Sequence, residues 1–573
     1  MKVSPLSWAQ HLRLRENQIF LMLVVLIGVL SGLGAVLFTL AIKGTTYLLF
    51  GISPSAVRYI VVPTVVSFIA GFLLKQYFPE ARGSGVPQVE AAYHLQNGYV
   101  PGRVAFGKFI TGVMCIGSGH SMGREGPSVQ IAAGVASTIA RWFRLSPERA
   151  RTLVPVAAAA ALAGAFNTPV AAVLFALEEI IGDMNAPLIG SAVLASVSAV
   201  IVERSILGNS PIFHVPQYKL VSPAELLAYL LLGTVGGVVS VAFCKGMLYA
   251  RGFCLRLPAR TRLLQPAAGG LLIGAILIFY PQVMGVGYEF VNQALNGGLL
   301  LKTMLVLCAV KLVATIISYS SGNAGGIFSP SLYLGAMAGG TVGMLVHKLA
   351  LFPAGDPGAY ALVGMGAVFA GIIRAPMTSV FMIFELTQDY QVFVPLMVAN
   401  MISYAISRQF QPVPLYRALL AQDHVHLPSA VAVASVHHAS EAMTSEFTMI
   451  PPDTTVRSAE QEIARAPARC LLVGNDGEIA GLITRERLEK ELHDGKAEAL
   501  LRDIAEAEYA HVHPDHSLDV VIARMEKSPG LLPVMSRSDT QRVLGVITPE
   551  SLAQFVQKIW GEAVKEIPLP PHR

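Results

Sequence analysis

Residues 108–129 read KFITGVMCIGSGHSMGREGPSV, and residues 311–332 read KLVATIISYSSGNAGGIFSPSL. At an offset of 203 residues the two stretches share glycines, a proline and a serine: Gly119 with Gly322, Gly123 with Gly326, Pro127 with Pro330, and Ser128 with Ser331. A second alignment, at an offset of 207 residues, matches Pro169 with Pro376 and Glu178 with Glu385. Because chance rarely aligns so many Gly and Pro in order, we interpret the chain as two homologous halves, about residues 20–205 and 220–410. The repeat by itself leaves open whether the halves run parallel or inverted.

The glycine breaks GREGP and GGIFSP each place a proline just inside a following apolar segment. Proline suits the first helical position, where its missing N–H is not needed. The first N–H groups of a helix have no intrahelical partner and carry about half a positive charge, so a helix N-terminus binds anions. We therefore expect one helix start from each half, in GREGP and in GGIFSP, to converge on one anion. GSGVP, residues 83–87, predicts a third such start at Gly85.

Glu125 stands inside the first glycine break. An ionised carboxylate beside helix N–H groups imitates an anion and can occupy the site, whereas a protonated carboxyl leaves it. We therefore predict that Glu125 couples anion occupancy to proton binding. The alternative is a simple ion pair with Arg124. Because adjacent residues point apart on a helix, we expect Arg124 to hold backbone carbonyls or a distant acid instead.

Two hydroxyls could add donors to the same site: Ser84 in GSGVP and Tyr416 in PVPLYRALL. Each has an ordinary alternative, since serine is a common helix cap and tyrosine a common anchor at the membrane surface. The acids Glu178 and Glu179 end the run LFALEEI. Proton relays in membranes use such acids, and an interfacial cap or a salt bridge is equally open. Since Glu178 matches Glu385 in the repeat, we predict a structural role for Glu178 and proton transfer for Glu179.

The composition places most of the chain in a membrane. Its 573 residues have a mean hydropathy of +0.56 and only 14% charged residues, against about 25% in soluble domains. Residues 19–42 and about 57–74 are apolar stretches close to the ~20 residues that span a bilayer. Later runs are shorter and interrupted, for example residues 106–116, 170–177 and 377–384. Since irregular backbone at membrane depth must be buried in protein or line a cavity, we predict the broken helices of a transporter rather than core helices of a soluble protein.

Charged residues become dense after about residue 440, which predicts a soluble domain behind the membrane domain. We expect a cytoplasmic lead-in at residues 1–18, a membrane domain at 19–420, a linker at 421–438 and a soluble domain at 439–573. The soluble domain is itself duplicated, at about residues 439–495 and 500–560, because CLLVGNDGEIAGLITRERL matches GLLPVMSRSDTQRVLGVITPESL. Each copy predicts a strand, a turn, a second strand and a helix start, at Thr484 or Thr548.

Other kinds of chemistry find little support in the sequence. The five cysteines are scattered and no Cys or His pair has metal-ligand spacing, so we expect neither disulfides nor a metal site. The net charge of +5 is explained by basic cytoplasmic loops and predicts no nucleic-acid partner. No Ser/His/Asp set or pair of catalytic acids occurs in one motif, so we expect no enzyme and no cofactor. An alternative function is a membrane receptor that signals through its soluble tail without transport. The repeat and the broken helices disfavour it, because they build a transport pathway that signalling does not require.

In their order and approximate spacing, GSGVP, GREGP, GGIFSP and the late PLY resemble the motifs of the CLC chloride channel and transporter family over about residues 20–420. The tail resembles a tandem pair of CBS modules. The resemblance implies an all-α polytopic membrane domain with two inverted repeats and broken, re-entrant helices, followed by a small α/β domain. It also implies a homodimer in a bacterial plasma membrane, with a pore in each subunit and both the N-terminus and the tail in the cytoplasm.

The resemblance further implies which residues act. Glu125 takes the place of the gating glutamate that faces the outside. Glu179, aligned on FxxEE, takes the place of the inner proton-transfer glutamate of the family's exchangers. The expected anion site comprises Ser84, Gly85, Arg124, Gly126, Ile327, Phe328 and Tyr416. Because family channels usually lack an acid at the position of Glu179, exchange of chloride for protons is favoured over an uncoupled chloride channel, which remains the alternative.

Departures from the family pattern bear on function. His120 stands where relatives more often have an apolar residue, and we expect a hydrogen-bonded loop histidine rather than a pH sensor. Arg487 and Ser551 replace the acid that binds ribose in nucleotide-binding CBS modules. This replacement puts adenine-nucleotide binding in doubt and predicts a structural tail. Ser84 and GREGP fit the chloride-type pattern, which disfavours fluoride and nitrate as substrates.

Overall fold

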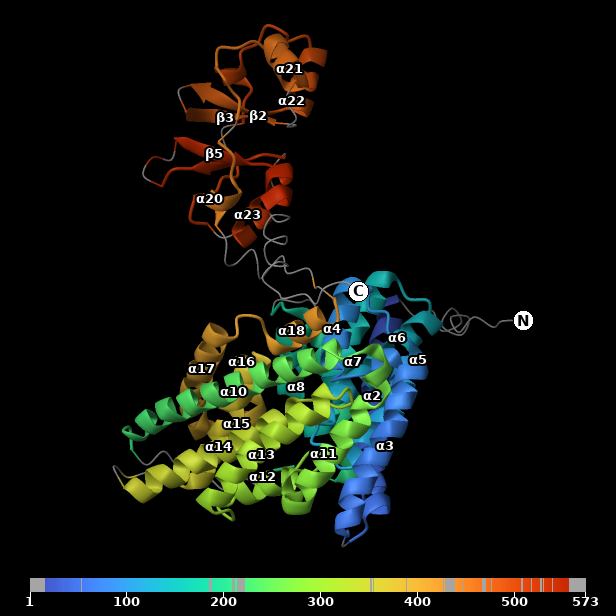
Figure 1. Ribbon diagram of the computed structural model, residues 1–573. Coiled ribbons are helices and arrows are strands. Elements are labelled where there is room, and N and C mark those ends of the chain that lie inside the picture. Colours follow the sequence, from blue (N-terminus) through green and yellow to red (C-terminus); the bar gives the residue numbers. More distant parts are fainter. Residues whose placement is uncertain are drawn as a thin grey trace, which may run out of the picture. The chain divides into compact units, whose positions relative to one another are not determined.

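The computed structural model describes residues 16–52, 54–184, 188–208, 212–213, 222–350, 353, 355–387, 389–425, 427, 438–445, 447–465, 470–475, 477–506, 509–516, 518–525, 528, 530–537, 539 and 541–555. The chain divides into two compact units, Met1–Leu427 and Pro428–Arg573, both drawn in Figure 1. This division falls inside the stretch that the sequence predicts as a linker.

Among the described residues of the first unit every regular element is a helix, and the helices occur in two matching series. The first series consists of α2 (Glu16–Phe50), α3 (Ala56–Gln76), η1 (Pro79–Ala81), α4 (Val86–Leu95), α5 (Gly102–Gly117), α6 (Glu125–Trp142), α7 (Pro147–Phe166), α8 (Pro169–Phe175), η2 (Ala176–Ile181) and α9 (Ile189–Leu207). The second consists of α10 (Glu225–Arg256), η3 (Ala259–Leu263), α11 (Gln265–Phe279), η4 (Pro281–Val283), α12 (Tyr288–Leu295), α13 (Leu301–Ser320), α14 (Phe328–Leu349), α15 (Pro357–Ile373), α16 (Pro376–Thr387), η5 (Tyr390–Val392), α17 (Phe393–Phe410) and α18 (Leu415–Gln422).

The first unit contains both long and short helices. Six helical stretches among the described residues are long and apolar enough to cross a membrane. Others are too short to do so upright, including α8 with seven residues and α16 with twelve, since a spanning helix needs ~20. The backbone turns that end α7 and α15 recur as well, because Asn167 and Arg374 both adopt left-handed conformations there. The predicted all-α fold with broken helices is confirmed.

Packing follows the same two-fold pattern. In the first half α2 packs against α9, and in the second half α10 packs against α17. Glycines allow the close approach in both pairs: a Cβ on Gly32 would lie 2.6 Å from the Ala199 carbonyl oxygen, and one on Gly233 would lie 2.8 Å from that of Ala399. Between the halves, α3 packs against α11 and α8 against α16. The apolar core of the unit therefore runs continuously through both halves.

The second unit contains two small α/β modules. The first module has β1 (Met449–Ile450), β2 (Cys470–Asn475), β3 (Glu478–Thr484), α21 (Val456–Arg465), α22 (Arg485–His493) and η6 (Leu501–Asp503). The second has α23 (Leu518–Met525), β4 (Leu532–Met535) and β5 (Val543–Ile547), and α20 (Ala439–Ala442) packs in its core. β2 pairs with β3 and β4 with β5 in antiparallel hairpins, as the sequence predicts. Thr484 caps α22, and apolar residues of both modules share one core, so the duplicated tail is one packed unit.

Candidate functional site

The two glycine breaks lie against each other at the centre of the first unit. The Gly123 amide donates to the Gly326 carbonyl oxygen, and the Gly326 amide donates to the Gly123 carbonyl oxygen, both at 2.7 Å. α6 and α14 begin within two residues of this antiparallel bridge. These glycines are the pair that the repeat aligns, so a local two-fold relation joins the halves here. The structure thus brings together helix starts from both halves.

The start of α4 joins the same place. Gly85, directly before α4, has a positive φ of 111°, which glycine adopts without strain. A Cβ on Gly85 would lie 2.4 Å from the Gly126 carbonyl oxygen, and one on Gly126 would lie 2.6 Å from Ser84 Oγ. Only residues without side chains allow this contact between backbones. Three helix N-termini, with their unpartnered N–H groups, therefore surround one small region.

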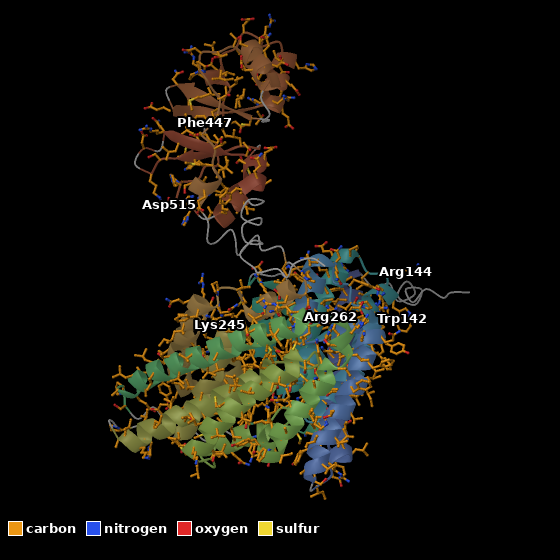
Figure 2. All side chains as sticks on the ribbon, in the orientation of Figure 1. Trp142, Arg144, Lys245, Arg262, Phe447 and Asp515 are labelled. Atoms are coloured by element: carbon orange, nitrogen blue, oxygen red, sulfur yellow. The ribbon has the colours of Figure 1, made fainter. Side chains whose placement is uncertain are left out.

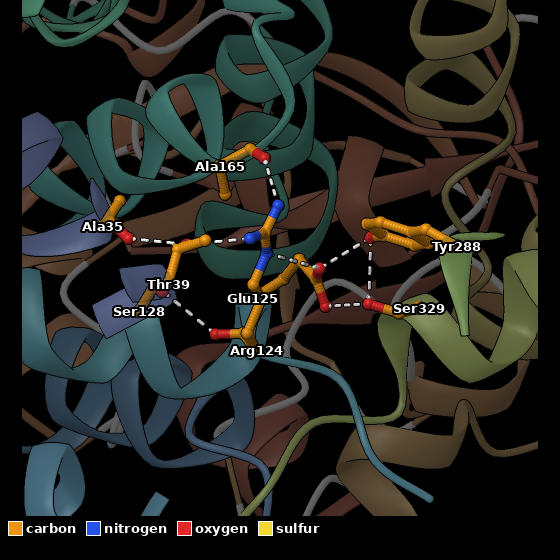
Figure 3. Close-up of polar contacts among 8 residues, drawn as sticks. All are labelled: Ala35, Thr39, Arg124, Glu125, Ser128, Ala165, Tyr288 and Ser329. Carbon is orange, nitrogen blue, oxygen red and sulfur yellow. Dashed lines mark hydrogen bonds and ion pairs between the residues drawn. The ribbon is translucent and has the colours of Figure 1, made fainter. Parts of the chain in front are cut away.

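The carboxylate of Glu125 lies in this region and is fully buried. The Tyr288 hydroxyl donates to Oε1 at 2.7 Å, and the Ser329 hydroxyl donates to Oε2 (Figure 3). Ser329 is the second residue of α14, so Glu125, from the start of α6, contacts the N-terminal turn of the helix from the other half. A charge-assisted hydrogen bond is roughly twice as strong as a neutral one, so the two hydroxyls hold the carboxylate at this position.

The expectation that Arg124 and Glu125 point apart is wrong. Arg124 Nε lies 3.8 Å from Glu125 Oε1, because Arg124 stands before the first turn of α6 and its long side chain folds back beside the carboxylate (Figure 3). The pair is long for an ion pair. The remaining guanidinium nitrogens donate to Thr39 Oγ1 at 2.8 Å and to the Ala165 carbonyl oxygen at 3.2 Å. Arg124 therefore also holds a backbone carbonyl, as the sequence analysis predicts.

Ser84 and Tyr416 supply two buried hydroxyls without a hydrogen-bond partner among the described residues. The two side chains lie near each other but not in hydrogen-bond geometry. Ser84 does not cap α4, whose cap position is Gly85, and Tyr416 is inside the protein rather than at its surface. The alternative roles, a helix cap for Ser84 and a membrane-surface anchor for Tyr416, are therefore wrong. Buried polar atoms without a partner are costly, and a bound anion would give these hydroxyls an acceptor.

Glu178 and Glu385 form reciprocal caps between the halves. Glu178 accepts hydrogen bonds from the amides of Met377 and Thr378 at the start of α16, at 3.0 and 2.7 Å. Glu385 accepts from the amides of Val170 and Ala171 at the start of α8, at 3.0 and 2.8 Å. The carboxylates satisfy N–H groups that have no intrahelical partner. The predicted structural role of Glu178 is confirmed.

Glu179, one residue further, points elsewhere. It is buried in the η2 turn, close to the Glu90 carboxylate of α4 and the Arg417 guanidinium of α18. Arg417 Nε lies 3.1 Å from Glu90 Oε1, and Glu90 is itself buried. The cluster therefore contains two buried acids and one partly exposed cation.

Two buried lysines hold the loops that precede α4 and α12. Lys108 Nζ donates to the carbonyl oxygens of Ala81 and Gly83 at 2.9 and 2.6 Å. Lys311 Nζ donates to those of Val283 and Gly285 at 3.0 and 2.8 Å. The first loop positions Ser84 and the second positions Tyr288, so the two lysines serve the two sides of the anion region in the same way.

The other predicted residues have ordinary contacts. His120 is buried and hydrogen-bonded to the hydroxyls of Ser67 and Ser318, which agrees with a structural loop histidine. In the second unit, Arg487 lies 3.2 Å from the Glu491 carboxylate. Ser551 Oγ accepts a hydrogen bond from the Thr548 amide at 3.1 Å. Among the residues that the structure describes, no group of three or more His, Cys, Asp or Glu side chains is arranged to hold a metal ion.

Sequence reasoning missed Tyr288, Ser329, Glu90 and Arg417. A weaker repeat could have found Tyr288, because GVGYEF at residues 285–290 aligns with GSGVPQ at residues 83–88. Ser329 aligns with Gly126 at the offset of 203 residues. Glu90 and Arg417 carry no repeat signal.

Comparison with known proteins finds related sequences for both units. Residues 66–408 match the family described as "Voltage gated chloride channel", and residues 439–494 and 501–558 each match the CBS domain. The H(+)/Cl(-) exchange transporter ClcA of Vibrio campbellii is 31% identical over 70% of this chain and 88% of its own length. A relative from Ralstonia nicotianae, named as a ClcB-like chloride channel protein, is 35% identical over 65% of this chain and 88% of its own length.

Solved structures show the same fold. A slow cyanobacterial Cl-/H+ antiporter superposes with a TM-score of 0.65 at 28% identity, over 70% of this chain and 97% of its own. A eukaryotic CLC transporter superposes with a TM-score of 0.61 at 22% identity, over 93% of this chain and 97% of its own. The predicted architecture, a polytopic helical domain followed by paired CBS modules, is therefore confirmed.

Proposed function

The chain belongs to the voltage gated chloride channel family, and we propose that it is a secondary-active antiporter that moves chloride across a membrane in exchange for protons. The observation that carries the proposal is the position of the Glu125 carboxylate. It lies between the starts of α6 and α14, where N–H groups and two hydroxyls are available to an anion. An ionised carboxylate and a chloride ion compete for this position. A protonated carboxyl has lost the charge that the site favours, so chloride takes its place.

In this proposal the anion is held by backbone N–H groups near Gly85, Arg124, Gly126, Ile327 and Phe328 and by the hydroxyls of Ser84 and Tyr416. Glu179 receives the proton from the other side of the membrane and passes it toward Glu125. Its burial beside Glu90 and Arg417 supports this role, since buried acids in membranes serve as proton relays. The relatives that are named as exchange transporters and antiporters support the same assignment.

The second candidate is a chloride channel without proton coupling, which the name of the Ralstonia relative suggests. A channel has no need of a buried acid at Glu179. Simultaneous chloride and proton flux in liposomes separates the two candidates, because only an exchanger moves protons uphill when a chloride gradient is applied.

The same assay tests the two glutamates. We expect Glu125→Gln to abolish proton movement and Glu179→Gln to abolish proton movement while chloride flux continues. Glu178→Gln is the matched control, since Glu178 caps α16. In the fraction of this variant that folds, the coupling of chloride flux to proton flux should be intact. Proton flux that persists in Glu125→Gln defeats the gating role. Equal loss of chloride and proton flux in Glu179→Gln would make that residue structural.

We also propose that the end of the first unit near the starts of α7 and α11 faces the cytoplasm, with the N-terminus and the CBS tail. The segments after α6 and α10 are basic, and in Figure 2 the labelled side chains of Arg144, Lys245 and Arg262 lie toward this end of the unit. Cytoplasmic loops carry an excess of Lys and Arg. Labelling of a single cysteine introduced at Arg144 in intact cells, by a reagent that does not cross membranes, is expected to fail.

For the homodimer, exposed apolar side chains on α9 (Val193, Val197, Ile201) and on α17 (Val394, Met397, Met401) form a stripe at helical spacing on each helix. We propose that these stripes pair in the assembly. Disulfide crosslinking between subunits that carry Val197→Cys tests this interface, and absence of a crosslinked dimer in the membrane counts against it.

A further inference from the structure

α9 carries an acid on its buried face. The residues of this helix that pack inside the first unit are Ala192, Ala195, Ser196, Ala199, Val200 and Glu203, which is the spacing of one helical stripe. Glu203 is 6% exposed, and its Oε2 has no hydrogen-bond partner among the described residues. Acids are almost never this buried unless they are paired, and an acid within a membrane segment is a candidate functional residue. Glu203 is therefore a buried carboxylate outside the roles assigned above.

The packing of α2 on α9 places Glu203 along the chain. A Cβ on Gly28 would lie 2.4 Å from the Ala195 carbonyl oxygen, and one on Gly32 would lie 2.6 Å from the Ala199 carbonyl oxygen. A step of four residues along α2 thus matches a step of four along α9, so the two helices run parallel here. Glu203, one turn beyond Ala199, therefore lies beside the turn of α2 that follows Gly32.

That turn of α2 and the end of α7 hold the Arg124 guanidinium. Its Nη1 donates to Thr39 Oγ1 on α2 at 2.8 Å, and its Nη2 donates to the Ala165 carbonyl oxygen on α7 at 3.2 Å (Figure 3). Both helices pack against α9. The charge of Arg124 consequently acts on the Glu203 carboxylate, which makes Glu203 the distant acid that the sequence analysis considers for Arg124.

Two cations act on Glu203, Arg204 and Arg124. Arg204, the next residue of α9, is exposed, and its Nε donates to Asn167 Oδ1 at 2.9 Å. Water and salt screen an exposed charge. The Arg124 side chain is only 13% exposed, so its interaction with Glu203 is screened much less. Neither cation forms an ion pair with Glu203 in the described part of the chain, so the carboxylate acts on Arg124 through its charge and not through contact.

The charge balance around Arg124 gives Glu203 a role. While Glu125 is ionised, its carboxylate lies 3.8 Å from Arg124 and offsets the guanidinium charge. When Glu125 binds a proton, that negative charge is lost. An unbalanced guanidinium beside a buried site would hold an entering anion strongly, whereas release needs moderate affinity. Glu203 supplies the negative charge that remains beside Arg124 in this state.

We propose that Glu203 is a positioning residue for the anion region, whose charge offsets that of Arg124 and thereby lowers the affinity for chloride. The inference rests on the proposed chloride transport. Glu203 acts through Arg124 and does not touch the ion. The expected effect on binding is therefore modest, about fivefold, since the energy between two charges falls with the distance between them.

Titration calorimetry of the full chain in detergent measures this effect without transport. The parent is Glu125→Gln, in which no ionised carboxylate competes with chloride, at about pH 9, far above the usual titration range of carboxyl groups. We expect Glu203→Gln in this parent to lower the dissociation constant for chloride about fivefold. Glu203→Asp, which keeps the charge, should leave the constant close to that of the parent. An unchanged or higher constant in Glu203→Gln overturns the proposal.

Two controls separate charge from packing. Glu225→Gln is the matched control, since Glu225 is also buried in a long apolar helix but accepts hydrogen bonds from the Tyr229 hydroxyl and the Gly355 amide. It should leave chloride affinity nearly unchanged. The effect of Glu203→Gln should also shrink as the pH falls, because the carboxyl of Glu203 then binds a proton. An effect of equal size at every pH would indicate altered packing and would count against the charge.

Chloride flux from proteoliposomes gives a second readout of the same variants. Tighter binding with slower release should lower both the half-saturating chloride concentration and the maximal flux when Glu203→Gln is added to Glu125→Gln. A lower maximal flux with an unchanged half-saturating concentration would mean a damaged fold and would contradict the proposal. If the wild type moves chloride without protons, exchange fails as the function, while the lower dissociation constant in Glu203→Gln still supports the role of Glu203.

Discussion

Tyr288→Phe removes one hydroxyl from the Glu125 carboxylate and keeps the aromatic ring. The hydroxyl donates to Oε1 at 2.7 Å, and the ring packs against Phe166 and Phe213 and beneath Arg124. A hydrogen bond to a charged group contributes about 1.5–3 kcal/mol. Because 1.4 kcal/mol is a factor of ten, the carboxylate should hold its position about 10- to 150-fold less tightly.

If the ionised carboxylate and chloride compete for one position, this weakening favours chloride. We expect the apparent dissociation constant for chloride, measured by titration calorimetry at alkaline pH, to fall by up to the same factor. In the Glu125→Gln background no ionised carboxylate competes, so Tyr288→Phe should change chloride binding little. The double-mutant cycle isolates the coupling between the hydroxyl and the carboxylate. Ser329→Ala, which removes the donor to Oε2, should behave in the same way.

Tyr333→Phe is the matched control, since Tyr333 is also buried but donates to the Gln282 carbonyl oxygen. The reasoning is refuted if Tyr288→Phe changes chloride affinity equally with and without Glu125. That result would mean that the hydroxyl binds the anion directly and does not hold the carboxylate.

Three further predictions concern buried lysines and helix caps that stabilise the fold, and each is measured by thermal unfolding of the purified protein in detergent. Lys108→Met and Lys311→Met each leave two buried carbonyl oxygens without their donor, which should cost at least about 2 kcal/mol; equal melting temperatures for wild type and variants would contradict this. Glu178→Gln and Glu385→Gln each remove a negative charge from a helix start and should destabilise by about 1 kcal/mol and by similar amounts, since the caps are related by the repeat. Thr484→Ala removes the cap of α22 and should lower the stability of the second unit by about 1 kcal/mol, with no effect on chloride flux.

Much of the fold could be read from local features. A glycine break followed by proline decides where a helix begins, whatever the rest of the chain does, so the starts of α6 and α14 follow from GREGP and GGIFSP. The repeat aligns these two helix starts with each other. It also distinguishes Glu178 from Glu179, because Glu178 recurs as Glu385 in the second half, and a residue that recurs in both halves is expected to have a structural role in both.

The contacts around Glu125 depend on how the halves pack. Tyr288 and Ser329 lie 163 and 204 residues away along the chain, and no local pattern states which loop will close over the carboxylate. The same is true of the Glu90–Arg417 pair, 327 residues apart. Arg124 and Glu125 lie close together, against the prediction, because helical side-chain directions do not hold before the first turn.

The sequence by itself therefore determined the membrane class, the duplicated halves, the helix starts and the acid that lies among them, because these depend on the chemistry of neighbouring residues. Only the tertiary structure decided which hydroxyls donate to Glu125 and which acid and cation lie beside Glu179. Those features arise when segments from distant parts of the chain pack together and share the same buried volume.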